Sequence, residues 1–167
     1  GAAAATEAVL RNPTAFAGLV IVGGAIAMDA APTAASLPLP IRPRILREAA
    51  VAASATNPLA TKTLLRGLLY NKEAATDDYI DVLQMPQRLV GTTAAYADWL
   101  PALLAPATNS LSRDPARFAN LPIPVRLIWG DKDTVTPPAQ AEAIATALGQ
   151  AKVIYLKDVG HIPHIEA

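Results

Sequence analysis

The sequence feature that most constrains the fold is a short apolar run at residues 17–23 (AGLVIVG), closed by Gly23-Gly24. A continuous, β-branched apolar run without alternation is typical of a strand that is buried on both faces of a parallel sheet. The Ala-rich residues 1–11 before it contain no breaker after Gly1 and predict a helix, which Asn12-Pro13 ends. Helix, tight turn and buried strand make half of a βαβ repeat.

The same alternation of helices and strands returns in the C-terminal part of the chain. The predicted elements are a strand at 124–129 (PVRLIW), a polar loop at 131–136, a helix from Pro137 or Pro138 to about 148, a strand at 152–156 (KVIYL) and the start of a helix at 162–166. Alternating elements of this kind predict an α/β fold with a parallel, doubly wound sheet.

The middle of the chain predicts a helical insertion. Four prolines crowd one window, Pro32, Pro38, Pro40 and Pro43, and indicate a hinge. Helices are predicted beyond it at 44–56, 58–70, 77–83 and 92–104, with Thr76 as an N-cap and Pro101 shortening or kinking the last one. No strand-like run occurs from 29 to 119. We therefore expect three parts, a core segment at 1–30, a helical cap at 31–119 and a second core segment at 120–167.

Composition narrows the function classes. Apolar residues make up 52% of the 167 residues and charged residues 17%, as in a globular domain with a sizeable core. The absence of cysteine excludes a disulfide scaffold and thiolate chemistry, and a net charge of zero provides no electrostatic footprint for nucleic acid or an anionic membrane. With no convincing membrane span and no visible signal peptide, the cytoplasm is the default expectation for the compartment.

Polar residues that could carry chemistry follow the two C-terminal strands. Asp131 and Asp133 follow the first strand, and Asp158 and His161 follow the second. Ligands of open α/β sheets bind at the carboxyl ends of the strands, so a carboxylate and an imidazole can meet there. Such a pair is two thirds of a nucleophile–His–acid triad, in the chain order acid then His.

Residues 124–167 resemble the C-terminal part of the α/β-hydrolase fold, in which a G-x-x-D turn follows one strand and a G-H turn follows the next. The resemblance implies that Asp133, in the turn 130–133 (GDKD), is the catalytic acid and that His161, after Gly160, is the general base. Residues 1–24 resemble the helix and strand that follow the nucleophile elbow of that family, and the proline-rich hinge with its helices resembles the cap domain. The expected fold is therefore a partial α/β-hydrolase with a helical cap insertion.

One departure from the family pattern is severe, because the elbow motif G-x-S-x-G is absent. By position Gly1 matches the last glycine of that motif, which would place the nucleophile two residues before the chain begins. We therefore expect the C-terminal half of a hydrolase, completed by a missing N-terminal half or by a second chain. The chain's own serines are expected to be ordinary cap or linker residues: Ser36, Ser54, Ser110 and Ser112.

Simpler interpretations apply to the other candidates. Asp131 is expected to be a turn carboxylate, and His164 a surface or packing histidine. The spacing H-x-x-H-x-E of His161, His164 and Glu166 matches zinc helices poorly, so no metal and no cofactor is expected. The aromatic residues of the predicted cap could line a substrate pocket or simply pack their helices: Tyr70, Tyr79, Tyr96 and Trp99.

Two functions are compatible with these residues. The first is hydrolysis of an ester or a similar small apolar substrate by the intact protein, through a nucleophile–His–Asp triad. The family also contains epoxide hydrolases, dehalogenases and haloperoxidases, and members with an Asp nucleophile use the same His to activate water. The second is a non-catalytic binding or interaction module on a hydrolase-like scaffold. The sequence assigns no substrate-binding residues.

Overall fold

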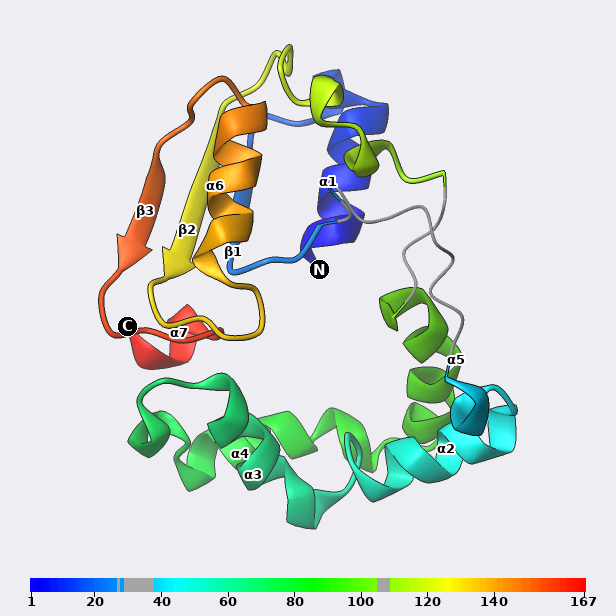
Figure 1. The fold of residues 1–167 in the computed structure, drawn as a ribbon. Helices are drawn as coiled ribbons and strands as arrows, with labels where there is room; N and C mark the ends of the chain where they lie inside the picture. The colour runs from blue at the N-terminus through cyan, green and yellow to red at the C-terminus, as the bar shows by residue number, and fades with distance from the viewer. Residues whose placement is uncertain (27, 29–37, 105–108) are drawn as a thin grey trace. The chain divides into compact units, whose positions relative to one another are not determined.

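The computed structural model describes residues 1–26, 28, 38–104 and 109–167. The chain divides into two compact units (Figure 1). The core unit comprises Gly1–Ala31, Leu68–Asn71 and Asn109–Ala167, and the helical unit comprises Pro32–Gly67 and Lys72–Thr108. These units reflect contacts within the chain, so the domain boundaries expected from the sequence (1–30, 31–119 and 120–167) stay a prediction.

A parallel sheet of three strands forms the centre of the core unit, as predicted for an α/β fold. Its strands are β1 (Leu19–Val22), β2 (Val125–Gly130) and β3 (Val153–Leu156), in the order β1-β2-β3. The register places Val22 beside Ile128 and Ile128 beside Ile154. The carboxyl ends of β2 and β3 therefore lie together at one edge of the sheet.

Two helices pack on one face of this sheet (Figure 1). They are α1 (Ala2–Arg11) and α6 (Pro138–Ala147). Their buried side chains, among them Val9 and Ile144, form one apolar cluster with residues of β1 and β2: Leu19, Ile21, Leu127 and Trp129. Burial of this cluster holds the strands in register and supplies a rigid base for the loops that follow them.

The other face of β1 differs from the sequence-based expectation. Leu19 and Ile21 are buried, but Val20 is 59% exposed and Val22 is 45% exposed. Ile154 of β3, on the same face as Val22, is 43% exposed. The prediction that this strand is buried on both faces is wrong for the chain as described, because its apolar cluster lies on one face only.

The remaining parts of the core unit are short. The 3-10 helix η1 (Pro13–Ala15) follows α1, and helix α7 (Pro163–Glu166) lies near the C-terminus. Two further 3-10 helices, η5 (Leu111–Arg113) and η6 (Pro115–Arg117), lead into β2. The Glu7 carboxylate of α1 accepts hydrogen bonds from the backbone N–H groups of Leu111 and Ser112 at 3.0 and 2.8 Å, which ties α1 to η5.

The helical unit contains the predicted helices with slightly different ends. Its helices are α2 (Arg44–Ala53), α3 (Pro58–Leu68), α4 (Asp77–Gln84) and α5 (Thr92–Leu104). The 3-10 helix η2 (Leu39–Ile41) precedes α2, and η3 (Lys72–Ala74) and η4 (Pro86–Arg88) join α3 to α4 and α4 to α5. Arg44 of α2 holds Asp98 of α5 through two hydrogen bonds of 2.9 and 3.2 Å.

The predicted N-cap and the predicted hinge have different outcomes. Thr76 caps α4, because its hydroxyl accepts a hydrogen bond from the Tyr79 backbone N–H at 3.4 Å, as predicted. Pro101 lies inside α5. Pro32 of the predicted hinge lies outside the described residues, whereas Pro38, Pro40 and Pro43 lie at η2 and directly before α2.

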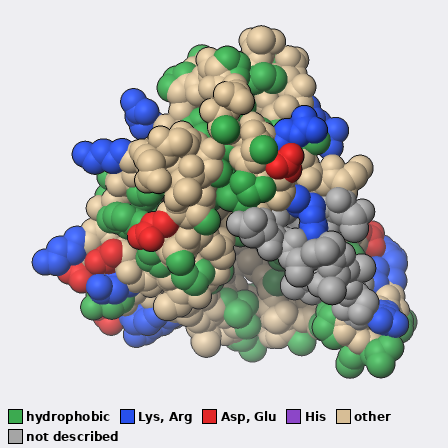
Figure 2. All heavy atoms as spheres, turned by 45° about the horizontal axis from the view of Figure 1, so that its top comes forward, with side chains coloured by type: hydrophobic (Ala, Val, Ile, Leu, Met, Phe, Trp, Pro, Cys, Tyr) green, Lys and Arg blue, Asp and Glu red, His purple; other side chains and the backbone are tan. Residues whose placement is uncertain are grey.

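Surface charge and helix length bear on possible partners. Figure 2 shows Lys and Arg side chains next to Asp and Glu side chains at several places on the visible face, in keeping with the net charge of zero. Among the described helices the longest is α5, with 13 residues. None of the helices in the described part of the chain is long and apolar enough to span a bilayer.

Candidate active site

The site lies where the loops after β2 and β3 meet. Gly130, the last residue of β2, allows these loops to approach each other closely. A Cβ atom at this position would overlap the carbonyl oxygens of Val159 and Gly160. The Lys132 backbone N–H also donates to the Val159 carbonyl at 3.0 Å, so the two loops are held together by their backbones.

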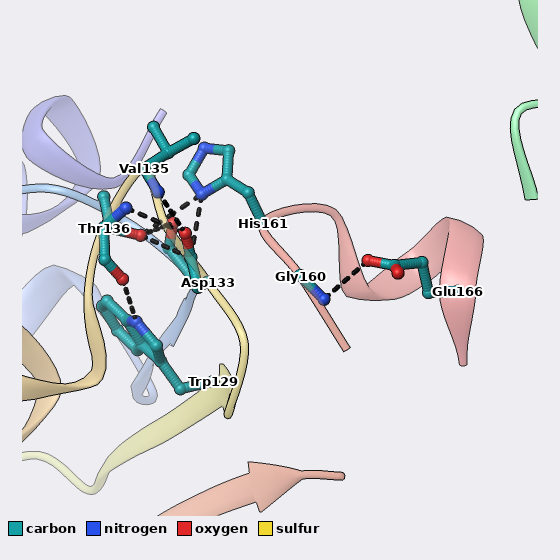
Figure 3. Close-up of polar contacts among 8 residues, drawn as sticks. Trp129, Asp133, Val135, Thr136, Gly160, His161 and Glu166 are labelled. Carbon is teal, nitrogen blue, oxygen red and sulfur yellow. Dashed lines mark hydrogen bonds and ion pairs between the residues drawn. The ribbon is translucent and has the colours of Figure 1, made fainter. Parts of the chain in front are cut away.

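Asp133 and His161 contact each other across these loops (Figure 3). The His161 Nδ1 atom lies 2.9 Å from the Asp133 Oδ2 atom, which confirms the contact predicted from the sequence. The Asp133 side chain is fully buried, whereas the His161 side chain is 24% exposed. An ionised carboxylate can only accept hydrogen bonds, so Nδ1 carries the hydrogen and Nε2 is the basic atom, on the other side of the ring.

The loop's own backbone and Thr136 hold the Asp133 carboxylate in place. Its Oδ1 atom accepts from the backbone N–H groups of Val135 and Thr136 at 2.9 and 2.8 Å. Its Oδ2 atom lies 2.6 Å from the Thr136 hydroxyl as well as 2.9 Å from His161. The carboxylate therefore cannot rotate away from the imidazole without losing several hydrogen bonds.

These contacts keep Asp133 ionised. Burial by itself raises the pKa of the Asp133 carboxyl, but the hydrogen bonds from Thr136, His161 and Val135 outweigh burial and hold this pKa below its usual value. A carboxylate that is charged at neutral pH can orient the imidazole and stabilise the imidazolium form.

Thr136 is a functional candidate that the sequence analysis missed. Its hydroxyl lies 3.2 Å from His161 Nδ1 and 3.0 Å from the Gly23 carbonyl oxygen, in addition to its contact with Asp133. Its own carbonyl accepts a hydrogen bond from the buried Trp129 indole at 2.7 Å. Thr136 thus links the sheet to the Asp–His pair. No local sequence pattern marks Thr136 for this role.

Gly23, directly after β1, borders the site as well. Its φ angle of +50° favours glycine, and a Cβ atom here would lie 3.4 Å from Asp133 Oδ2 and 3.3 Å from the His161 carbonyl oxygen. From the sequence, Gly23 is predicted only to end the strand. In the structure the carboxyl ends of all three strands converge on the Asp–His pair.

The other sequence candidates lie apart from this pair or join it indirectly. Asp131 accepts a hydrogen bond from the Asp158 backbone N–H at 2.8 Å, so its carboxylate joins the two loops. His164 is exposed on α7. In the part of the chain that the structure describes, no group of three or more His, Cys, Asp or Glu side chains could hold a metal ion.

The serines and aromatic residues fall into several settings. Ser36 lies outside the described residues, and the Ser54 hydroxyl donates to the Ala50 carbonyl at 2.6 Å. Ser110 is the N-cap residue of η5, and Ser112 is buried in that turn.

In the helical unit the rings of Tyr96 and Trp99 pack edge to face at 5.5 Å between centroids. Tyr70 and Tyr79 are exposed.

Comparison with known protein families identifies the family of this chain. The sequence pattern of the "Alpha/beta hydrolase family" matches residues 1–167, the whole chain. The chain belongs to the alpha/beta hydrolase family.

Solved structures of hydrolases share this fold. A meta-cleavage product hydrolase from Pseudomonas fluorescens superposes with a TM-score of 0.74 at 17% identity, over 99% of this chain and 56% of that one. A 2-hydroxy-6-oxo-6-phenylhexa-2,4-dienoate hydrolase from Rhodococcus sp. gives a TM-score of 0.68 at 18% identity, with the same coverage. This alpha/beta hydrolase chain therefore spans about half the length of these structures.

Two curated lipases match a shorter stretch of the chain. Lipase 3 of Moraxella sp. (strain TA144) is 40% identical over 60 residues, which is 36% of this chain and 19% of the lipase. Lipase 1 of Psychrobacter immobilis is 37% identical over 60 residues, with the same coverage.

Proposed function

We propose that this alpha/beta hydrolase chain supplies the acid and the general base of a nucleophile–His–Asp triad, with Asp133 as acid and His161 as base. One observation carries the proposal: a buried, ionised carboxylate lies 2.9 Å from the Nδ1 atom of a partly exposed imidazole. The pair lies at the carboxyl ends of parallel strands, where open α/β sheets bind their ligands.

The roles of the two residues follow from their chemistry. His161 Nε2 takes the proton of a nucleophile as that nucleophile attacks an acyl carbon, and then returns it to the leaving alcohol. A water molecule, deprotonated by the same nitrogen, then attacks the acyl carbon; the acyl–nucleophile bond breaks, the nucleophile recovers its proton from His161, and the acid product leaves. Asp133 keeps the hydrogen on Nδ1 and stabilises the positive charge that develops on the ring.

The proposed substrate is an ester or a similar small apolar compound. The lipase names of the two curated relatives support an ester, although each match covers only 19% of the relative. Because this chain spans 56% of the solved hydrolases and lacks a G-x-S-x-G motif, we propose that the nucleophile comes from an N-terminal half or a second chain. An Asp nucleophile there would direct His161 to activate water instead.

The test is a burst assay with a chromogenic ester. It compares the 167-residue chain with a polypeptide extended at its N-terminus to include a nucleophile elbow. We expect an acyl-enzyme burst from the extended polypeptide only, since loss of even one oxyanion donor costs about 10²–10³ in turnover. His161→Ala in the extended polypeptide should lower kcat by about 10³-fold or more, whereas His164→Ala should not.

Three outcomes would count against the proposal. A stoichiometric burst from the 167-residue chain would show that one of its own serines is the nucleophile. If neither His161→Ala nor Asp133→Asn changes the rate of hydrolysis by the extended polypeptide, the triad assignment is wrong. Failure of the extended polypeptide to turn over any acyl substrate would favour a binding module on a hydrolase scaffold.

A further inference from the structure

The loop that carries His161 is bonded to a segment far away in the sequence. The His161 backbone N–H donates to the Leu68 carbonyl oxygen at 2.9 Å. Leu68–Asn71 belongs to the core unit, although the residues on both sides of it, up to Gly67 and from Lys72, belong to the helical unit. The segment 68–71 is therefore part of the core unit, next to the candidate general base.

The Glu166 carboxylate bonds to both segments that this contact joins, through Gly160 and Asn71. Its Oε2 atom accepts a hydrogen bond from the Gly160 backbone N–H at 2.7 Å, and its Oε1 atom accepts one from the Asn71 backbone N–H at 2.6 Å. Figure 3 shows the carboxylate of α7 reaching back to Gly160, the residue before His161. Hydrogen bonds to a charged acceptor are roughly twice as strong as those between neutral groups.

Gly160 leaves no space between these parts. A Cβ atom at Gly160 would lie 2.6 Å from the Tyr70 backbone nitrogen, 2.8 Å from the Leu68 carbonyl oxygen and 3.0 Å from Glu166 Oε2. The loop thus packs directly on the backbone of the 68–71 segment. Movement of either segment changes the position of the other.

We infer that Glu166 is a positioning residue for His161: through Gly160 and Asn71 its carboxylate fixes the backbone of the base against the 68–71 segment. The inference rests on the proposed function for the role of His161. Asp133 holds the ring of His161 at one end. At the other end the Leu68 carbonyl accepts from the His161 backbone N–H, and Glu166 holds the adjacent Gly160 together with Asn71. A general base must be held within about 0.5 Å of its productive position, so both ends matter to the proton transfer.

The central experiment is Glu166→Gln, with Glu142→Gln as the matched control. A glutamine keeps one acceptor oxygen but places an NH₂ group against the second backbone N–H, so at most one of the two hydrogen bonds survives. Glu142 is an exposed carboxylate of α6 in the same unit, 3.2 Å from the Tyr155 hydroxyl and on another element. The control therefore makes the same chemical change away from the His161 loop.

The first readout is NMR of the 167-residue chain and needs no turnover. In Glu166→Gln we expect the amide exchange of Gly160, His161 and Asn71 to rise about tenfold or more, with the control unchanged. We also expect the His161 Nδ1–H resonance, which reports the hydrogen bond to Asp133, to shift or broaden. Faster exchange with an unaltered Nδ1–H resonance would show a structural clamp and overturn the positioning role.

The second readout is the kinetics of the N-terminally extended polypeptide. We expect Glu166→Gln to lower kcat about tenfold while KM stays within about twofold, because the substitution displaces the base rather than the substrate. An unchanged kcat beside an altered Nδ1–H resonance would also overturn the inference. Absence of turnover in the parent polypeptide would count against the proposed function alone, since the NMR readout is independent of it.

The parent chain gives a further measurement in case Glu166→Gln does not fold. If the Glu166 carboxylate joins the two segments, the amides of Gly160, His161 and Asn71 open together, with equal opening free energies and equal denaturant dependence. Exchange of the Asn71 amide about 100-fold faster than that of His161 would show that the segments move independently and would overturn the inference.

Discussion

At the scale of single residues, the Asp133 carboxylate accepts hydrogen bonds from several donors besides the His161 imidazole. The Val135 N–H, the Thr136 N–H and the Thr136 hydroxyl all bond to it in addition to His161. Such contacts lower the reorganisation needed when charge appears on the ring, because the carboxylate is already fixed before any proton moves. The same hydrogen bonds also contribute to the stability of the fold.

Thr136→Val tests the hydroxyl at this point. Valine keeps the shape of threonine but removes the group that contacts Asp133 and the Gly23 carbonyl in a buried site. We expect the free energy of unfolding to fall by about 1–3 kcal/mol in urea titrations. Thr146→Val is the control, because the Thr146 hydroxyl is exposed on α6 and donates to the Glu142 carbonyl of the same helix. It should change stability by about 0.5 kcal/mol or less; equal losses in both variants would contradict the role given to Thr136.

The lowered pKa of Asp133 makes stability depend on acid pH. Unfolding returns this carboxyl to its ordinary pKa of about 3.9, so its contribution is complete above that pH and is lost as the pH falls through the lower folded pKa. Asp133→Asn should therefore cost about 1–3 kcal/mol at pH 7 and progressively less in stronger acid. Urea unfolding of both proteins across this range measures the difference. A gap between them that is constant with pH would show that the Asp133 charge does not contribute.

How far the sequence predicts the site depends on the kind of contact. The Asp133–His161 contact follows from strand order alone, because parallel neighbours place their following loops at one edge of the sheet. The contacts of Thr136, Gly23 and Glu166 depend on the path of each loop in space. No local pattern distinguishes a threonine or glutamate with such contacts from one in solvent.

At the scale of secondary-structure elements, the order of helices and strands is predictable, whereas several ends are not. The helix predicted at 58–70 ends at Leu68. The Leu68 carbonyl there accepts from His161, and the Asn71 N–H donates to Glu166. These tertiary hydrogen bonds replace the next helical turn. The local sequence does not predict these hydrogen bonds, because their partners lie more than 90 residues away.

The strand β1 shows a second limit of sequence patterns. An apolar run indicates that both faces of a strand tolerate burial, but other segments decide which faces are covered. In β1 the side chains of Leu19 and Ile21 are covered, and those of Val20 and Val22 are not.

Alanine substitutions in β1 measure this difference. We expect Ile21→Ala to lower the free energy of unfolding of the 167-residue chain by about 2–5 kcal/mol, because it opens a cavity beneath the sheet. Val20→Ala, at a solvent-exposed position of the same strand, should cost about 1 kcal/mol or less. Thermal or urea unfolding of both variants provides the comparison. Equal costs would mean that the second face of β1 is also covered in solution.

At the scale of the whole molecule, one face of the sheet leaves apolar side chains in water. Val20, Val22 and Ile154 are each more than two-fifths exposed on it. Parallel sheets are otherwise found with both faces covered. The chain spans only 56% of the solved hydrolases that it matches, so further sequence of the whole protein, or a second chain, is the proposed cover for this face.

Val22→Lys distinguishes a solvent-exposed face from a covered one by how much the lysine lowers the free energy of unfolding. In the 167-residue chain the lysine ammonium would remain in water, so we expect little loss of stability and weaker concentration-dependent association in sedimentation experiments. In an N-terminally extended polypeptide that covers this face, the same lysine would be buried without a partner and would lower the free energy of unfolding by several kcal/mol. Arg11, exposed on α1, supplies the control, because α1 packs on the opposite face of the sheet and Arg11→Lys keeps the charge there. A Val22→Lys effect of the same size in both polypeptides would show that the added sequence does not cover this face, and the proposed arrangement would then be wrong.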